Sequence, residues 1–488
     1  MSRQLNELIK DFPHTLVTGS ADTEITGICM DSRKVAPGNL FICISGYTSD
    51  GHDFIPKAVE SGAAALIVEK DVDVPSDITV IKVDNARPAL ALISAAWYDY
   101  PSKNLTVIGL TGTKGKTTTA HMIKRILETA GHKVGMIGTN GAFIGPDKVD
   151  LDIRNTTPES FDLQYLFSLM VKEGCSHVVM EVSSQSLKLH RVDGIDFDTV
   201  AFLNLSPDHI SPNEHADFDE YKNCKLALFP MGKKSVIFMD NEHSDDFLKA
   251  SVNPVTASFT KDADFTAENI HNLWEGDRFG VEFTLHTKEK SDTVYVSMPG
   301  SFNAENALIA SAVTSLEGVS VDEIKKALSE ISVKGRTQVI KEALPKACVM
   351  IDYAHNAFST QYVLEMLKEY HPKRLVCVFG CGGNRAASRR IGMGEVAGAF
   401  ADLCVITMDN PRFEEMADIN KGIIEGIEKS GGKYIAIDDR AEAIRWCLDQ
   451  AKPGDIYALL GKGHETYQEV KGVRTHFSEE EVVLDYFR

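Results

Sequence analysis

The sequence predicts an α/β protein of three domains, and three observations lead to that prediction. Its 488 residues exceed what one hydrophobic core usually organises, because domains typically hold about 100–200 residues. A Gly/Thr-rich loop joins a strand pattern to a helix pattern in the middle of the chain, and strand and helix patterns alternate after residue 335. We therefore expect a small N-terminal α/β domain (1–101), a central P-loop mononucleotide-binding α/β domain (102–334) and a C-terminal Rossmann-like α/β domain (335–488).

The first domain is indicated by short apolar runs that alternate with weaker helical patterns and end near Tyr100-Pro101. These runs, which we expect to be strands, lie at residues 25–30, 39–44, 63–68 and 79–83.

The second domain opens with a strand at residues 105–110 and a helix whose Ile123, Ile126 and Leu127 share one face before Gly131 ends it. Residues 279–298 alternate apolar and polar side chains, which predicts a hairpin beside the parallel sheet, and a helix from Ala304 to Leu316 follows. Further strands of this domain are expected at residues 177–182, 199–205 and 234–239.

The third domain repeats strand then helix, the pattern of a doubly wound sheet. Its strands are expected at residues 348–354, 374–380, 403–408, 433–438 and 455–461.

Composition excludes several classes of protein. The net charge is −19 without a block of basic residues, which disfavours a nucleic-acid surface, and no apolar run approaches the roughly 18 residues of a membrane span. The N-terminus lacks a signal-peptide pattern, and the nine cysteines have no metal-type spacing and read as reduced thiols. We expect a cytoplasmic protein, monomeric, with small-molecule substrates.

The loop from Gly109 to Thr119 is the strongest functional signal. Its glycines allow backbone N–H groups to surround a polyphosphate at the positive end of the helix that follows. Lys116 is expected to reach the β- and γ-phosphates, and the Thr117 hydroxyl to bind Mg²⁺. The spacing departs from the general P-loop pattern, since residue 110 is leucine. The phosphate-binding residues are Gly112, Thr113, Lys114, Gly115, Lys116, Thr117 and Thr118.

The form TGTxGKTTT resembles the Mur ligase family, and further motifs follow in that family's order along essentially the whole chain. The segments around Glu181, His209 and Lys225 are similar to the family's metal-binding and carbamylated-lysine segments. The resemblance implies that Glu181, His209 and Thr117 bind Mg²⁺. It also implies that Lys225, as a carbamate formed with CO₂, orients a second Mg²⁺, and that Lys116, Glu181, His209 and Lys225 are the catalytic residues.

Four residues beyond the loop resemble the family's other ATP contacts, so ATP is expected between the second and third domains. They are Asn306, Arg336, Asp352 and His355. Two departures occur here: Asn-Ala-Phe follows His355 and Thr-Gln follows Arg336.

Within the family, the MurE type resembles this chain best. That type adds the third amino acid to UDP-MurNAc-L-Ala-D-Glu, and ten residues are similar to its contacts with that substrate. They are Met30, Ser32, Tyr47, Thr48 and Ser49 in the first domain, and Asn155, Thr156, Thr157, Ser183 and Arg191 in the second. Leu189 stands where the type often has glutamine.

The third domain resembles the amino-acid site of the MurE type. Its Asp-Asn-Pro-Arg motif is the form associated with meso-diaminopimelate, whose distal carboxylate Arg412 would bind while Glu465 pairs with the distal ammonium. L-Lysine lacks that carboxylate. The residues expected at this site are Arg385, Asp409, Asn410, Pro411, Arg412, Gly461 and Glu465.

The resemblance thus implies an ATP-dependent ligase that joins meso-diaminopimelate to UDP-MurNAc-L-Ala-D-Glu through an acyl phosphate in peptidoglycan precursor synthesis. The alternatives are an L-lysine-adding MurE, a divergent paralogue, another ligase of the superfamily such as the MurF type or folylpolyglutamate synthetase, and a non-catalytic nucleotide-binding scaffold.

Overall fold

The computed structural model describes residues 2–46 and 49–488 and divides the chain into two compact units. The first unit comprises Met1–Asp264 and Ala312–Val319, and the second comprises Phe265–Ser311 and Ser320–Arg488. The predicted boundaries after residues 101 and 334 stay predictions.

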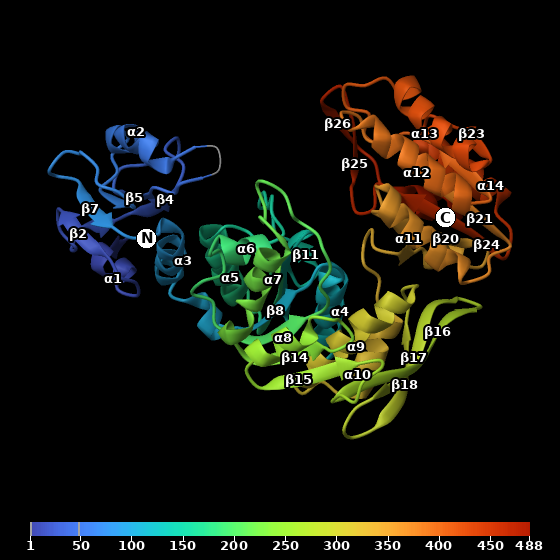
Figure 1. Ribbon diagram of the computed structural model, residues 1–488, viewed down its shortest axis with the longest axis horizontal. Helices are drawn as coiled ribbons and strands as arrows, with labels where there is room; N and C mark the ends of the chain where they lie inside the picture. The colour runs from blue at the N-terminus through green and yellow to red at the C-terminus, as the bar shows by residue number, and fades with distance from the viewer. Residues whose placement is uncertain (1, 47–48) are drawn as a thin grey trace. The chain divides into compact units, whose positions relative to one another are not determined.

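The N-terminal part of the first unit is a five-stranded sheet packed against helices (Figure 1). Four strands are parallel, and β2 runs antiparallel at the edge. The sheet order is β2 (Thr15–Thr18), β7 (Thr79–Lys82), β6 (Ala65–Val68), β5 (Asn39–Ile42) and β4 (Gly27–Cys29), with β1 (Arg3–Gln4) pairing β3 (Glu24–Ile25) separately. The helices are α1 (Leu5–Ile9), α2 (Ile55–Glu60) and α3 (Ala86–Trp97).

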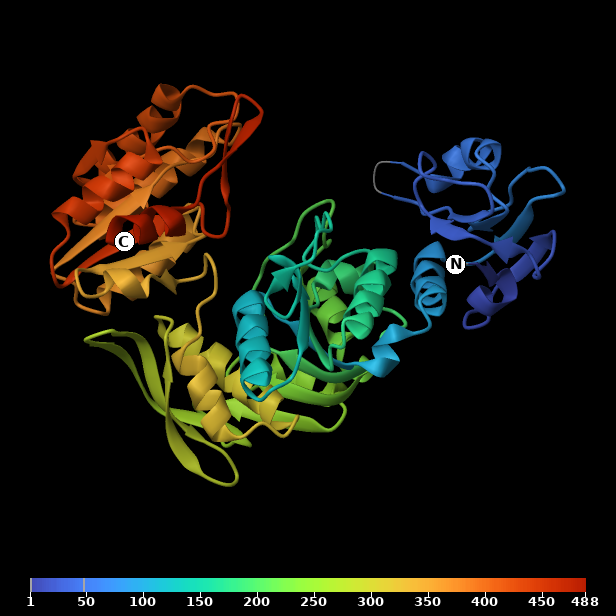
Figure 2. The same cartoon turned by 180° about the vertical axis from the view of Figure 1, so that it is seen from behind.

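The rest of the first unit is a larger, mostly parallel sheet. Its central strands are buried on both faces, as parallel strands covered by helices usually are. The order of all strands in this part is β11 (Asp147–Lys148), β10 (Gly141–Ile144), β9 (Val134–Gly138), β12 (His177–Glu181), β8 (Thr106–Thr111), β13 (Phe197–Phe202), β14 (Gly232–Phe238) and β15 (Pro254–Ser258). The helices are α4 (Lys116–Thr129), α5 (Ser160–Lys172), α6 (Ser184–Lys188), α7 (Phe218–Leu226) and α8 (Ser244–Ala250). Figure 2 shows α4, in teal, beside the sheet, where it contacts β8, β9 and β12.

The second unit begins with three strands that pair antiparallel to one another, β16 (Phe265–Glu275), β17 (Arg278–His286) and β18 (Ser291–Val296). The predicted hairpin is confirmed, because Val281, Phe283 and Leu285 are buried and pair in register with β18. The predicted helix is α9 (Ser301–Ser315), and α10 (Val321–Ser329) follows it behind a Ser320–Glu323 capping box.

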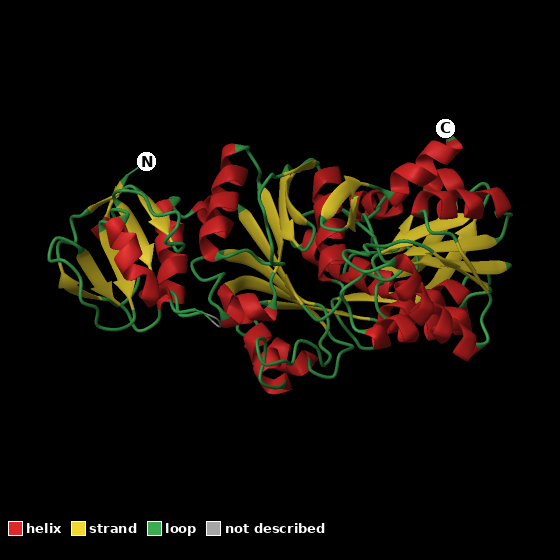
Figure 3. Cartoon of the chain, turned by 90° about the horizontal axis from the view of Figure 1, so that it is seen from above, coloured by secondary structure: helices red, strands yellow, loops and turns green. Residues whose placement is uncertain are grey.

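The C-terminal sheet has parallel strands with helices on both sides (Figure 3), which confirms the Rossmann-like pattern. The sheet order is β19 (Gln338–Val339, antiparallel), β20 (Cys348–Asp352), β24 (Asp455–Leu460), β21 (Arg374–Phe379), β22 (Leu403–Ile406) and β23 (Tyr434–Ala436). The helices are α11 (Ala357–Lys368), α12 (Ala387–Phe400), α13 (Met416–Ser430), α14 (Arg440–Gln450) and α15 (Glu479–Phe487), and a hairpin joins β25 (Tyr467–Val470) to β26 (Val473–His476).

Two further observations bear on the class of protein. All nine cysteines are free thiols, eight of them buried. Within the described ranges, no helix has both the length and the apolar character needed to cross a membrane.

Candidate active site

The glycine-rich loop connects β8 to α4, and hydrogen bonds to the loop that follows β13 hold its conformation. Gly115 adopts φ +85°, a left-handed conformation that suits glycine, and stands at the helix N-cap. The Thr113 N–H donates to the Asn204 carbonyl (2.9 Å), and the Lys114 N–H donates to the Asn204 side chain (2.9 Å). The Thr113 hydroxyl lies 3.0 Å from the Tyr221 hydroxyl. The loop is therefore a shaped turn at a helix N-terminus, which suits a phosphate group.

Two lysines meet at this loop. Lys116 Nζ donates to the Gly112 carbonyl at 2.7 Å, and Lys225 Nζ, from α7, donates to the same oxygen at 3.0 Å. Lys225 is only 1% exposed, and its Nζ lies 4.7 Å from the centre of the Tyr221 ring. Burial and, next, the Lys116 charge hold the pKa of Lys225 well below its usual value. Lys225 is thus a buried lysine that readily gives up its proton.

Glu181, at the end of β12, faces the first turn of α4. It is 2% exposed, and both its carboxylate oxygens lie 3.0 Å from the Thr117 hydroxyl. Thr139, which the sequence reasoning missed, also donates to Glu181 through its N–H (2.9 Å) and hydroxyl (3.2 Å). A Cβ on Gly138 would lie 2.2 Å from Glu181 Oε1, so any larger residue there would displace the Glu181 carboxylate. Carboxylate and hydroxyl oxygens are the ligands that Mg²⁺ prefers.

His209 lies in the loop between β13 and α7 with a left-handed φ of +56°. Its Nδ1 is 2.8 Å from Glu214 Oε1, and its side chain is half exposed. Over the described part of the chain, no three His, Cys, Asp or Glu side chains are grouped so as to hold a metal ion. Of the three residues expected to bind Mg²⁺, Glu181 and Thr117 are in contact with each other, whereas His209 contacts Glu214.

Three of the residues expected to bind the peptide part of the nucleotide substrate form one hydrogen-bonded network at the C-terminal end of β12. The Thr157 hydroxyl donates to the Glu181 carbonyl (2.8 Å) and accepts from the Ser183 N–H (3.1 Å). Arg191 is 7% exposed, donates to the Thr157 carbonyl (3.2 Å) and pairs with Glu159 (2.6 Å). Glu159 was not predicted from the sequence.

The other residues of this set are dispersed. The Thr156 hydroxyl lies 3.2 Å from that of Thr139, whereas Asn155 is exposed. In the N-terminal part, Ser32 is buried, Met30 packs on the core and Ser49 is exposed. Tyr47 and Thr48 lie outside the described residues.

The remaining expected ATP contacts lie in the second unit. Asp352 ends β20 and accepts from the N–H groups of Thr337 (2.7 Å) and Ala354 (2.8 Å). The Arg336 guanidinium lies 5.5 Å from the centre of the Tyr353 ring. Asn306, on α9, is 3% exposed and donates to Asn303.

The residues that depart from the family pattern have structural roles. Asn356 caps α11 with Ser359 in a capping box. Gln338 accepts from the Gly335 N–H (3.0 Å) and donates to Glu480 (2.8 Å). The departures therefore keep the local turns hydrogen-bonded.

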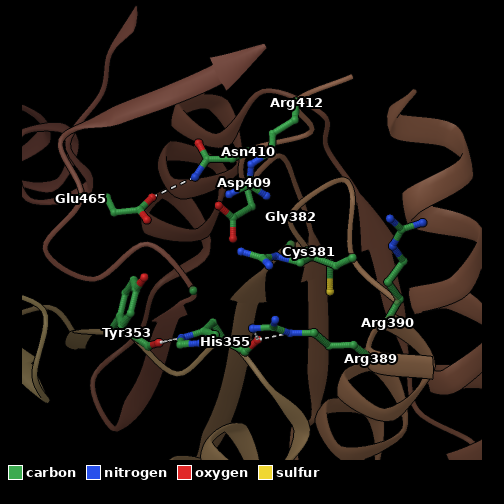
Figure 4. Close-up of a pocket in the computed structure, with 13 residues that line it drawn as sticks. Tyr353, His355, Cys381, Gly382, Arg389, Arg390, Asp409, Asn410, Arg412 and Glu465 are labelled. Carbon is green, nitrogen blue, oxygen red and sulfur yellow. Dashed lines mark hydrogen bonds between the residues drawn. The ribbon is translucent and has the colours of Figure 1, made fainter. Parts of the chain in front are cut away.

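A pocket with a cavity volume of about 170 Å³ lies where the parallel strands β20, β24, β21 and β22 end (Figure 4). Ligand sites of open α/β sheets occur at this edge. Of the seven predicted amino-acid-binding residues, only Pro411 does not line the pocket. The six that line it are Arg385, Asp409, Asn410, Arg412, Gly461 and Glu465. Gly382, which opens the segment 382–385 that resembles the family's amino-acid site, lines the pocket as well. The sequence reasoning missed five other lining residues: Tyr353, Gly380, Cys381, Arg389 and Arg390. His355, predicted to contact ATP, lines the pocket too.

The pocket combines cationic and anionic walls. Arg412 has φ +53° and donates to the Gly383 carbonyl at 2.8 Å, which fixes its guanidinium. Arg389 donates to the His355 carbonyl (2.9 Å), and burial lowers the pKa of His355. Asn410 donates to Glu465 (2.9 Å) on the opposite side (Figure 4). This arrangement suits a small zwitterion with both carboxylate and ammonium groups.

The chain is similar to Mur ligases along its whole length. Residues 24–98 match the Mur ligase family catalytic domain, residues 110–314 the Mur ligase middle domain, and residues 335–463 the glutamate ligase domain. The UDP-N-acetylmuramoyl-L-alanyl-D-glutamate--2,6-diaminopimelate ligase of Caldanaerobacter subterraneus subsp. tengcongensis is 42% identical over 484 residues, covering 99% of this chain and 98% of that protein. The protein of the same name from Clostridium botulinum is 41% identical and covers 99% of both chains.

A solved structure of a ligase with that name superposes with a TM-score of 0.75 at 29% identity, covering 100% of this chain and 99% of the other. Three matched domains in one order, together with relatives of equal length, confirm the three-domain fold expected from the phosphate loop and the motifs after it. The chain belongs to the Mur ligase family.

Proposed function

We propose that this chain is an ATP-dependent ligase that joins meso-diaminopimelate to UDP-MurNAc-L-Ala-D-Glu. The observation that supports it most is the pocket in which Arg385 and Arg412 accompany Glu465. Meso-diaminopimelate ends in a second carboxylate and a second ammonium, which an arginine fork and a glutamate bind in a complementary way. L-Lysine has no carboxylate at that end and would leave Arg412 without a ligand partner. The names of the relatives point to the same reaction.

In this proposal each domain binds one substrate. Residues 1–101 bind the uridine diphosphate, residues 102–334 bind ATP, and residues 335–488 bind the amino acid. The loop before α4 holds the phosphates, and Lys116 contacts the β- and γ-phosphates. Thr157, Ser183 and Arg191 hold the acceptor peptide. The protein acts as a monomer in the cytoplasm and needs neither a nucleic acid nor a membrane.

The reaction requires activation because a free carboxylate is a poor electrophile. ATP transfers its γ-phosphoryl group to the D-Glu γ-carboxylate, which gives an acyl phosphate and ADP. The amine of the third residue then attacks the acyl carbon, and the tetrahedral intermediate collapses to the amide and inorganic phosphate. Lys116 and the N–H groups of the loop counter the charge that develops on the phosphoryl oxygens.

Metal ions complete the proposed site. Thr117, Glu181 and His209 would hold Mg²⁺, and a carbamate on Lys225 would orient a second ion; bound there, Mg²⁺ neutralises phosphate charge. The buried Glu181 carboxylate and Thr117 hydroxyl supply oxygen ligands that fit such an ion. Only a neutral amine reacts with CO₂, so the lowered pKa of Lys225 favours the carbamate.

The test is an assay with purified protein, ATP, Mg²⁺ and UDP-MurNAc-L-Ala-D-Glu. Phosphate release and product mass are measured with meso-diaminopimelate, L-lysine, L-ornithine or no amino acid. Tripeptide product with meso-diaminopimelate alone is the expected result. Product with L-lysine would show that the chain is an L-lysine-adding enzyme instead. The absence of product with every amino acid would favour the divergent paralogue or the non-catalytic scaffold.

A further inference from the structure

Lys462 is a buried cation next to the amino-acid pocket, although it does not line it. It follows β24 and is 0% exposed. Its Nζ donates to Glu465 Oε2 (3.0 Å) and Asn410 Oδ1 (3.1 Å), and lies 3.5 Å from Asp409 Oδ1. All three partners line the pocket. A buried ammonium is stable only when it is paired and hydrogen-bonded, so Lys462 and these partners depend on one another.

These bonds determine which way the Asn410 amide points. Its Oδ1 accepts from Lys462 Nζ and from the Glu469 N–H (2.9 Å), which occupies both lone pairs of that oxygen. Both partners are donors only, so a flipped amide would place its NH₂ group against two donors. The Nδ2 group of Asn410 therefore faces Glu465, to which it donates at 2.9 Å (Figure 4).

The same bonds leave one oxygen of Glu465 for a ligand. Oε2 accepts from both Lys462 and Asn410, whereas Oε1 has no hydrogen-bond partner within residues 2–46 and 49–488. Lys462 also offsets one of the two negative charges of Asp409 and Glu465. The pocket's four arginines then dominate, which favours an amino acid that carries an additional carboxylate over the more cationic lysine.

A second buried pair holds the strands that carry these loops. Arg440 pairs with Glu479 at 2.7 Å, with their side chains 0% and 1% exposed. Arg440 also donates to the carbonyls of Leu460 (2.7 Å), which ends β24, and Met408 (3.2 Å), which precedes Asp409. Arg440 therefore holds the backbone just before Lys462 and just before Asp409.

We propose that Lys462 is a positioning residue that sets the amino-acid selectivity of the pocket by orienting Asn410 and Glu465. The proposal rests on the proposed ligase function. Lys462 acts through Asn410 and Glu465 and does not touch the substrate.

The experiment compares wild type, Lys462→Met, Glu465→Gln and the double variant Lys462→Met/Glu465→Gln in the ligase assay. Loss of a buried ionic partner should raise KM for meso-diaminopimelate by about tenfold or more in Lys462→Met. KM for ATP and KM for the nucleotide peptide should stay within about threefold of their wild-type values. The described residues that are proposed to bind these two substrates form no hydrogen bond with Lys462. The ratio of kcat/KM for meso-diaminopimelate to that for L-lysine should fall. Lys429→Met, an exposed lysine in the same domain, is the matched control and should behave as wild type.

The double variant tests whether Lys462 acts through Glu465. Adding Lys462→Met to Glu465→Gln should raise KM for the diamino acid by no more than about threefold, because the ion pair between Lys462 and Glu465 is already absent. This comparison also stands alone if Lys462→Met does not fold. A full tenfold rise in the Glu465→Gln background, or an unchanged KM in Lys462→Met, overturns the proposal while wild-type ligase activity is retained. A wild-type protein that neither reacts with nor binds meso-diaminopimelate by calorimetry overturns the proposed function and this inference together.

Discussion

Lys116 and Lys225 donate to one carbonyl oxygen, that of Gly112, from helices α4 and α7. Two ammonium groups so close to one another repel, and Lys225 is almost wholly buried. The burial first, and then the repulsion from Lys116, lower the pKa of Lys225 and favour its neutral amine. Conversion of that amine to a carbamate would place an anion beside Lys116.

Lys225→Ala should lower kcat by about 100-fold or more, because a positioned charge that supports phosphoryl transfer is lost. Added formate or acetate should restore part of the rate by supplying a carboxylate in the vacated space. The assay is phosphate release with and without the short acid. Lys222→Ala, on the same helix but paired with Asp246, is the control and should keep its activity. A Lys225→Ala variant that formate does not rescue would argue against the carbamate.

Glu181→Gln should raise the Mg²⁺ concentration needed for half-maximal activity by about tenfold or more, because an amide oxygen binds Mg²⁺ more weakly than a carboxylate does. Thr117→Val should act in the same direction, and Thr117→Ser, which keeps the hydroxyl, should be close to wild type. Activity is measured across a Mg²⁺ titration at saturating ATP. Equal Mg²⁺ dependence in wild type and Glu181→Gln would show that Glu181 does not bind the metal.

Arg412→Ala should raise KM for meso-diaminopimelate by about 10- to 100-fold, the usual cost of losing a charge-assisted bond to a carboxylate. The KM for L-lysine should change far less, because lysine offers Arg412 no distal carboxylate. Initial rates with the two amino acids measure the difference. Arg445→Ala, an exposed arginine on α14, controls for the loss of a positive charge in the same domain. An equal loss for both amino acids would place the Arg412 contact elsewhere on the substrate.

His177 should make the free energy of unfolding depend on pH. Burial, with the neighbouring His132, lowers its pKa to about 4, whereas the pKa of an unfolded histidine is about 6.5. The folded state therefore binds fewer protons between these values, so stability is full above pH 6.5 and falls as the pH decreases towards 4. His177→Gln should reduce that fall by about 1–3 kcal/mol, measured by urea unfolding at pH 7 and pH 4.5. His14→Gln, at an exposed histidine, should leave the dependence unchanged.

Strands with a clear apolar pattern were predictable, whereas several others, among them β2 and β16, were not. The alternating residues of β17 and β18 are buried where the pattern predicted. All four residues of β2 are exposed, so no apolar alternation marks it as a strand. In β16, a shift of register between Glu268 and His271 interrupts the period. β2 lies at the edge of its sheet, where pairing with β7 stabilises it although its own sequence shows no pattern.

Sequence motifs also showed only part of each site. Six residues of the amino-acid pocket were found because they stand in motifs that follow strands. Arg389, Arg390 and Tyr353 were missed, because helix α12 and the end of β20 reach the pocket only through the folding of the sheet. Thr139 and Glu159 were missed for the same reason, since each contacts its partner across more than 30 residues of chain.

The sequence by itself determined the fold class, the phosphate loop and the order of the motifs, because these depend on local patterns and on residue type. Only the tertiary structure decided that Lys225 is buried against the carbonyl that Lys116 also contacts, and that Lys462 sets the direction of the Asn410 amide. Burial and hydrogen-bond partnership arise when distant segments pack together, and these, rather than residue identity, control protonation and side-chain orientation.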